Sequence, residues 1–412
     1  MAFLGWQRRS AESDVSTLKE PTSWFMRAFG ASMSETGTLV SEESAMRFMA
    51  VFACVRVLAT TGAFLPAQLY RRTGSGKELA DNHYLYKLIH KQPREGLTSY
   101  KLREWIMRCL LLNGNAYVLP LRDNRGRIGE FQELNRGDVN VYEYQKKLFY
   151  KVDGYSLPFT ESDIIHIRYM GDGKMGLSPI GYQRETIGAG IAARSYNSKF
   201  YAQGAHVPGY LTTDGALKPD QREHIKGQWK QKHAGLDGAF STPLLEGGLE
   251  YKTISIPQKD AQFLEMMKFN RTEIAGMYGV PPHLIADLER ATFSNIEHQD
   301  LAYVKYALGP LLANIEQEFN SKIFRYDENS YFMEHNMNAL LRADVKSRGE
   351  FYAKMFSSGV FTHNQILSLE NMNGYEGGDR RYVPVNMVPT DRIDDMIDNN
   401  QNTNEEPSEE AA

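Results

Sequence analysis

The chain has 412 residues, of which 42% are hydrophobic and 24% are charged. This balance is typical of a soluble globular protein that is long enough for roughly two or three structural units. The formal net charge of −4 argues against a protein that holds nucleic acid tightly, although nucleic acid could slide past such a surface.

The cysteines and the hydropathy of the sequence indicate in which cellular environment the protein resides. Cys54 and Cys109 both lie in apolar helical patterns, so we expect buried free thiols and a reducing environment. The most apolar run, residues 49–70, contains Arg56 and is interrupted by glycine and proline, so it does not predict a membrane span. The N-terminus lacks the long apolar core of a signal peptide, and we therefore expect a soluble protein that is not exported.

The N-terminal part predicts an arm, a helix and a hairpin. Residues 1–43 are polar and show little periodicity, which predicts a flexible arm. A helix is expected over 44–63 and a strand over 68–71, which enters the glycine-rich turn 73–77. This turn is not a phosphate-binding loop, because the sequence has arginine and glutamate where that motif needs glycine and Ser or Thr.

Residues 98–168 predict a mixed unit. A helix is expected over 98–113, with Ser99 near its start and Gly114 just past its end. Alternating apolar and polar residues then predict five strands, so helices should cover an antiparallel sheet. The strands span residues 116–121, 130–134, 139–144, 147–152 and 164–168.

A helix rich in small residues should follow. Ser178 and Pro179 suit the cap and the first turn of a helix that runs to about residue 203. It contains Gly181, Gly188 and Gly190, with Ala189, Ala192 and Ala193 close to the last two. A glycine within a helix costs about 1 kcal/mol relative to alanine, so the pattern indicates close approach of another backbone, either from a second subunit or from the same chain.

Residues 207–256 predict a compact strand, helix and strand, over 209–212, 219–233 and 249–256. The helix is the most basic stretch of the chain. Such a run of charge is either a solvated face or a contact surface for nucleic acid or another protein. Its basic residues are Lys218, Arg222, His224, Lys226, Lys230, Lys232 and His233.

Two long apolar helices are expected near residues 258–279 and 297–324. Gly279 and the pair Pro281–Pro282 end the first, because glycine supplies a left-handed cap and proline interrupts the hydrogen-bond ladder. Gly309–Pro310 lies within the second helix and predicts a kink. The stretch between the two helices is polar and predicts a loop.

The C-terminal part predicts one strand, two helices and a tail. The strand, 331–335, should return to the first mixed unit. Helices are expected over 342–358 and 362–370, the second capped by Thr362. Residues 391–412 contain eight acids against one arginine and are expected to be disordered.

The sequence contains no motif of a catalytic or metal site. His-Glu-x-x-His, Cys-x-x-Cys and Gly-x-Ser-x-Gly are all absent. His283 follows two prolines and is expected to anchor its loop rather than act as a base. We therefore expect no enzymatic activity, no catalytic residues, no metal and no cofactor.

Several motifs occur in an order that is specific to one family. They are Asn113–Tyr117, Asp163–Arg168, Gly176–Ile180, the helix with Tyr-Gly-Val-Pro-Pro-His-Leu, the loop and kinked helix after it, and Glu334–Asn338. Over residues 49–384 the chain resembles the portal proteins of tailed bacteriophages, of the type found in many long-tailed phages.

The resemblance implies an α+β portal fold with a mixed α/β wing, a long helical stem, a small α/β clip and a helical crown. The implied divisions are a flexible arm 1–43, the first part of the wing 44–177, a stem helix 178–204, the clip 205–257, a second stem helix 258–279, a tunnel loop 280–296, the kinked helix and second part of the wing 297–341, the crown 342–390 and a disordered acidic tail 391–412.

The resemblance also implies a homo-oligomeric ring, typically a dodecamer, at one vertex of the capsid. Terminase, docked on the clip through its large subunit, would pump double-stranded DNA through the channel without sequence specificity, and the DNA would leave again on infection. The major capsid protein would contact the wing, and head–tail adaptor proteins would contact the clip. Assembly would take place in the host cytoplasm, and the mature protein would reside in the virion.

Two sets of residues are expected to carry this function. The tunnel loop would face the channel, and its mixed charge would suit sliding, because a ring of lysines would hold phosphates. An ordinary exposed connector is the alternative. The tunnel-loop residues are Asp287, Leu288, Glu289, Arg290, Thr292, Phe293, Ser294 and Asn295. The basic face of the clip, for terminase or DNA, comprises Lys218, Arg222, Lys226, Lys230 and Lys232.

Two other functions fit parts of the sequence. One is a DNA-acting phage enzyme or accessory subunit, such as a nuclease. The sequence lacks the cluster of carboxylates that metal-assisted hydrolysis requires, which argues against this function. The other is a purely structural head or tail connector. Such a connector would not need a clip, a long stem and a loop together.

Overall fold

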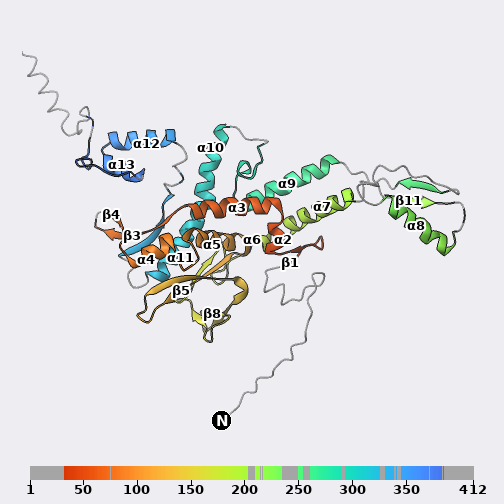
Figure 1. Ribbon diagram of the computed structural model, residues 1–412, viewed down its shortest axis with the longest axis horizontal. Coiled ribbons are helices and arrows are strands. Elements are labelled where there is room, and N and C mark those ends of the chain that lie inside the picture. Colours follow the sequence, from red (N-terminus) through yellow and green to blue (C-terminus); the bar gives the residue numbers. More distant parts are fainter. Residues whose placement is uncertain are drawn as a thin grey trace, which may run out of the picture. The chain divides into compact units, whose positions relative to one another are not determined.

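The computed structural model (Figure 1) forms two compact units, Met1–His335 and Asn336–Ala412. Each unit contains helices, and the first contains antiparallel sheets as well, so the expected α+β class is confirmed. The structure describes residues 32–74, 76–202, 209–213, 215, 217–233, 249–253, 260–288, 293–324, 330–337, 340, 345–370, 372–382 and 384.

The first described elements are a small hairpin and a short helix. β1 (Ser32–Met33) pairs with β2 (Leu39–Val40), and the hydroxyl of Ser41 then caps α2 (Glu42–Met46). The arm predicted over 1–43 is therefore wrong for residues 32–43, whereas residues 1–31 lie outside the described part. Two-residue strands are too short to show a period in the sequence, which explains the error.

Two buried helices form the centre of the first unit. α3 (Met49–Phe64) packs against α5 (Ser99–Asn113), and both contribute fully buried aliphatic side chains. The side chain of Thr98 caps α5, which begins at Ser99, and Gly114 lies just past its end, as predicted, with its backbone in the left-handed region. The helix predicted from residue 44 is broken at Arg47–Phe48, where the backbone becomes extended before α3 begins.

Both cysteines are free thiols, as expected. Cys54 is buried on α3, and Cys109 is half-buried on α5. Burial raises the pKa of the Cys54 thiol to about 12, which keeps it protonated and unreactive.

One sheet joins distant parts of the chain. β3 (Ala67–Thr73) forms the expected hairpin with β4 (Gly76–Leu79), and β13 (Tyr331–His335) pairs with the other edge of β3. The prediction that residues 331–335 form a strand that returns to the earlier part of the chain is confirmed. A helical turn α4 (Tyr84–Tyr86) and a π-helical turn η1 (Lys87–Lys91) follow β4.

The remaining strands of this region form two sheets rather than one. A single turn of 3₁₀ helix, η2 (Arg136–Asp138), changes the chain direction between them. Buried side chains from both sheets, Tyr117 and Tyr150 among them, share one core. The first sheet has the order β10 (Ile165–Arg168), β5 (Asn115–Arg122), β6 (Ile128–Leu134), and the second has the order β7 (Val139–Tyr144), β8 (Lys147–Val152), β9 (Phe159–Thr160).

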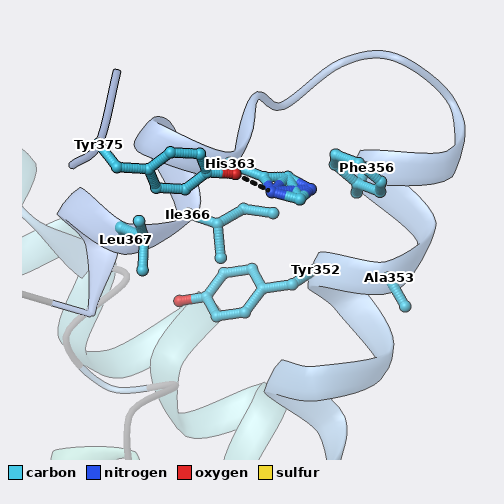
Figure 2. Close-up of a pocket in the computed structure, with 7 residues that line it drawn as sticks. All are labelled: Tyr352, Ala353, Phe356, His363, Ile366, Leu367 and Tyr375. Atoms are coloured by element: carbon cyan, nitrogen blue, oxygen red, sulfur yellow. Dashed lines mark hydrogen bonds between the residues drawn. The ribbon is translucent and has the colours of Figure 1, made fainter. Parts of the chain in front are cut away.

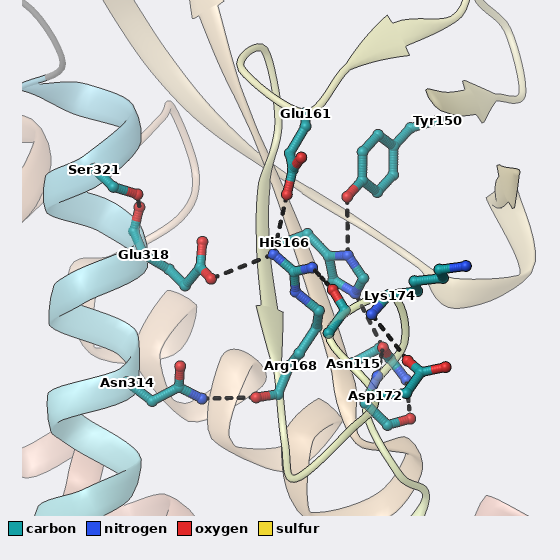
Figure 3. Close-up of polar contacts among 12 residues, drawn as sticks. Asn115, Tyr150, Glu161, His166, Arg168, Asp172, Lys174, Asn314, Glu318 and Ser321 are labelled. Atoms are coloured by element: carbon teal, nitrogen blue, oxygen red, sulfur yellow. Dashed lines mark hydrogen bonds and ion pairs between the residues drawn. The ribbon is translucent and has the colours of Figure 1, made fainter. Parts of the chain in front are cut away.

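A buried polar chain crosses this core (Figure 3). His166 on β10 lies between the hydroxyl of Tyr150, 3.1 Å from its Nδ1, and Oδ1 of Asn115, 3.0 Å from its Nε2. The amide nitrogen of Asn115 donates to the carbonyl oxygens of Asn113 and Gly176, which fixes its oxygen as an acceptor. His166 therefore carries its proton on Nε2 and accepts from Tyr150 at Nδ1.

Beside these polar residues two backbone segments, one at Gly114 and one at Gly176, cross in close contact. Gly114 has φ +77°, and a Cβ built there would lie 2.0 Å from the carbonyl oxygen of Leu177. A Cβ on Gly176 would lie 1.9 Å from the carbonyl oxygen of Gly114. Only glycine fits at either position, because the obstructing atoms belong to backbone.

Arg168 connects β10 to a later helix. Its guanidinium approaches Glu161 at 3.3 Å and Glu318 at 3.5 Å, and its carbonyl oxygen accepts from Asn314 at 2.8 Å (Figure 3). Glu318 and Asn314 belong to α11 (Gly309–Ile323), which packs on β10. These contacts fix the second half of the first unit against its central sheet.

The small-residue helix is divided into α6 (Pro179–Tyr182) and α7 (Arg184–Ala202). A Cβ on Gly188 would lie 2.4 Å from the side chain of Ser34, and a Cβ on Gly190 would lie 2.6 Å from the ring of Phe48. Both glycines therefore face their own chain, the second of the two alternatives drawn from the sequence.

The compact segment that follows has the expected strand–helix–strand order. β11 (Gly209–Thr212) pairs with β12 (Glu250–Thr253), and α8 (Pro219–His233) lies between them in the chain. The boundaries of the clip remain predictions, and so do those of the wing, the stem and the crown.

The second unit contains α12 (Val345–Ser357) and α13 (His363–Leu369), close to the predicted helices. Thr362 and Gln365 form a capping box at α13. Asn364 forms hydrogen bonds to the backbone of Tyr375 through both its amide oxygen and its amide nitrogen, which folds residues 372–382 back onto the helix.

Tyr352, Phe356 and other apolar side chains line a hollow of 350 Å³ on this unit (Figure 2). The predicted acidic tail lies outside the described residues.

Candidate functional site

The end of the first long helix is fixed by buried contacts. α9 (Asp260–Tyr278) ends with Gly279 at φ +64°, as the sequence predicts. The hydroxyl of Tyr278 donates to the carbonyl oxygen of Leu111 on α5 at 3.0 Å, and burial raises the pKa of this phenol. A Cβ on Gly279 would lie 3.2 Å from the methyl group of Ala307, so this turn also packs closely on the following helix.

The double proline leads into a tight turn rather than an irregular loop. The residues after Pro281 form one turn of 3₁₀ helix, η3 (Pro282–Ile285), which ends at Ala286 in the left-handed region. The backbone N–H of Asp287 donates to the carbonyl oxygen of Pro282 at 3.0 Å. The first part of the predicted loop 280–296 is therefore a rigid turn.

His283 anchors this turn to the next helix. Its Nδ1 lies 3.0 Å from Oε1 of Gln299, and its Nε2 lies 2.9 Å from Oδ1 of Asp300. Both partners lie on α10 (Phe293–Ala302). The sequence-based prediction that His283 anchors the loop is confirmed.

The structure describes part of the predicted tunnel loop. Asp287 is mostly buried and faces Arg271 of α9 at 3.7 Å, whereas Leu288 is 64% exposed. Glu289, Arg290 and Thr292 lie outside the described residues.

Three predicted loop residues belong instead to the first turn of α10, which begins four positions before the predicted start at residue 297. These residues are Phe293, Ser294 and Asn295, of which Asn295 is exposed. The prediction erred because Ser294 and Asn295 are polar and do not continue the apolar stripe from which the start was inferred.

The second long helix is distorted one turn before the predicted kink. A π-helical segment η4 (Tyr303–Leu308) joins α10 to α11, and the backbone stays helical through Gly309 and Pro310. Proline lacks an N–H, and its ring would clash with the carbonyl oxygen four residues earlier in a regular helix. The wider π-turn removes that conflict, so the helix continues.

The predicted basic face of the clip lies along α8. Arg222 and Lys226 are exposed and one helical turn apart, so they share a face, and exposed Lys218 lies just before the helix. Lys226 makes only a loose pair with Glu223 at 3.8 Å, and both side chains are largely exposed. The backbones of Lys230 and Lys232 continue α8, and the structure describes nothing of their side chains.

The described residues contain no group of three histidine, cysteine, aspartate or glutamate side chains that could hold a metal ion. Within the same residues, no helix is long and apolar enough to cross a membrane.

The fold is that of a portal or neck subunit. The structure resembles an HK97-family phage portal protein from Corynebacterium diphtheriae with a TM-score of 0.57 and 17% identity, covering 73% of this chain and 96% of the other. It also resembles a chain in the virion of a gene transfer agent with a TM-score of 0.55 and 23% identity, covering 81% and 94%.

Sequence comparison identifies the family. The model of the phage portal protein family matches residues 49–371. The chain is 29% identical over 367 residues to the portal protein of Enterobacteria phage HK97, covering 86% of each. It is 30% identical over 376 residues to the probable portal protein of Streptomyces phage phiC31, covering 86% of this chain and 81% of the relative. The chain belongs to the phage portal protein family.

Proposed function

We propose that this portal protein forms a homo-oligomeric ring, a dodecamer, at one vertex of a phage capsid. Double-stranded DNA enters the capsid through the ring during packaging and leaves through it during infection. The family match over residues 49–371 carries this proposal. A likeness to the neck of a gene transfer agent with C12 symmetry supports the ring, with a TM-score of 0.54 and 22% identity.

The partners follow from the same proposal. The terminase large subunit docks on the clip, where Arg222 and Lys226 offer exposed positive charge. The major capsid protein contacts the wing, and head–tail adaptor proteins bind the clip after packaging. The protein assembles in the host cytoplasm and is retained in the virion. Its role is structural, and no observation on the described residues favours the nuclease alternative.

Imaging of the purified full-length protein by negative-stain electron microscopy tests the ring. We expect rings with a central hole and twelvefold symmetry, either from the protein alone or from the protein produced together with its shell proteins. Monomers in both preparations would contradict the proposal. Cleavage of plasmid DNA in Mg²⁺ would instead support the enzymatic alternative.

The tunnel loop is tested at Leu288, which is exposed and directly follows the anchored turn. We expect Leu288→Asp to leave ring assembly intact and to lower the yield of DNA-filled particles at least about tenfold, because it adds a ring of negative charge that faces phosphates. The measurement is nuclease-resistant DNA per particle.

Leu157→Asp is the matched control for this change, since Leu157 is 78% exposed and lies in the loop between β8 and β9. Normal packaging by the Leu288 variant would show that the loop does not face the DNA.

A further inference from the structure

An exposed aromatic cluster lies on the outer face of the sheet formed by β7, β8 and β9. The inner face carries Val141 and Tyr150, which pack into the core. On the opposite face, Tyr142 is 41% exposed and Tyr144 is 61% exposed, and both rings contact Phe149 of β8. We call these three residues, Tyr142, Tyr144 and Phe149, the aromatic platform.

The platform is preformed. β7 and β8 are joined by a tight turn with positive φ at Gln145 and Lys146, and the strands pair in register from Tyr144–Lys147 onward. The ring of Tyr142 stacks on Phe149 at 5.8 Å between centroids and 19° between planes. Little side-chain entropy would be lost on binding, because the rings already hold one another in place.

A hollow with two lysines adjoins the platform. It measures 440 Å³ and shares Phe149 with the platform. Among the described residues, neither Lys147 nor Lys322 in this hollow has an ion-pair partner. The carboxylate of Glu161, which also lines it, is held by Arg168 at 3.3 Å. We call this site the lysine hollow; it is lined by Lys147, Leu148, Phe149, Thr160, Glu161, Ser162, Ser321 and Lys322.

Positive charge lies beside the platform on the outer face of β8. Lys147 and Lys151 alternate with Phe149 along β8 and are exposed on the same face of the sheet. The acid of β7, Glu143, points to the other face and is held by Lys174 at 2.5 Å. An apolar centre with unpaired cations at its edge is complementary to a segment that carries both apolar side chains and carboxylates.

We propose that the aromatic platform and the lysine hollow together bind an acidic, extended segment of a protein partner. Apolar side chains of the segment cover the tyrosines, and its carboxylates pair with Lys147 and Lys322. Single-stranded nucleic acid is the other ligand class with this chemistry, but it needs open ring faces for stacking. Here Tyr142 and Phe149 already stack on each other. The proposal concerns a surface of one subunit and does not depend on ring assembly.

Fluorescence anisotropy with the full-length protein tests this surface. The probe is a labelled peptide of about twelve residues that alternates glutamate and valine, compared with a peptide that has lysine in place of glutamate and with an oligothymidylate of about twelve nucleotides. We expect only the acidic peptide to bind. We also expect the Lys147→Glu, Lys322→Glu pair and the Tyr142→Ser, Tyr144→Ser pair each to weaken binding at least about tenfold.

The Lys87→Glu, Lys91→Glu pair is the matched control, because it makes the same charge change at two exposed lysines of η1. It should leave binding unchanged. Thermal melting verifies that each variant is folded. Equal affinity of all variants for the acidic peptide, absence of binding, or tighter binding of the oligothymidylate would each overturn the proposal.

Discussion

Replacing Gly114 by alanine is expected to destabilise the first unit by about 4 kcal/mol or more. The new methyl group would lie 2.0 Å from the carbonyl oxygen of Leu177, an atom of the backbone that cannot rotate away. Relief requires separation of the two crossing segments, and this breaks the bonds from Asn115 to Gly176 that join them. The expected fall in Tm is roughly 5–10 °C.

Gly126 provides a matched control within the same unit. Its φ is also +77°, but a Cβ there would meet nothing within 4 Å. Gly126→Ala should cost only the left-handed backbone penalty of about 1–2 kcal/mol. Thermal melts of the two variants, followed by circular dichroism, separate the clash from the backbone effect. Equal Tm values would show that the crossing relaxes at little cost.

Acid is expected to destabilise the first unit through His166. Burial, and then the positive charge of Arg168, lowers the pKa of His166 to about 3, whereas an unfolded chain titrates near 6.5. Below about pH 6.5 the unfolded state therefore binds a proton that the folded state does not, so stability is lost as the pH falls from about 6.5 toward about 3. The expected loss is roughly 1.4 kcal/mol for each pH unit.

The measurement is the free energy of unfolding of the native protein and of His166→Gln at several pH values between 7 and 4.5. By pH 4.5 the native protein should lose about 2–3 kcal/mol more than the variant, which has no imidazole to protonate. Other groups titrate in both proteins and cancel in the comparison. Parallel profiles would mean that His166 accepts a proton in the folded state without cost.

Local signals in the sequence predict most of the helices and strands. Gly114 at the end of α5 and Thr362 before α13 are capping residues whose effect depends on a few neighbouring residues. The alternating strands from β5 to β8 are detected for the same reason. The sequence alone does not reveal how these strands divide between two sheets, because that depends on contacts between distant residues.

Features that depend on tertiary packing are missed. Gly188 and Gly190 pack against residues that are distant in the sequence, and no short window of sequence contains those contacts. The same holds for the break before α7 and for the π-helical segment before Pro310. The aromatic platform is missed because Phe149 and Tyr150 are adjacent aromatic residues, and only the fold decides which of them enters the core.

The candidate site is predicted in part. The anchoring role of His283 could be inferred from its place after two prolines, but its partners Gln299 and Asp300 could not. The exposure of Leu288 is as expected for a loop residue. The start of α10 was placed too late, because Ser294 and Asn295 interrupt the apolar periodicity from which that start was inferred.

The pairing of β13 with β3 has a consequence for synthesis of the protein on the ribosome. Lys77 on β4 and Glu334 on β13, which form an ion pair across this sheet, are 257 residues apart in the chain. At about 5–20 residues per second, the edge of β3 stays unpaired for many seconds of translation. The nascent chain therefore exposes a strand edge that can join other chains, and an N-terminal fragment that ends before β13 retains this hazard permanently.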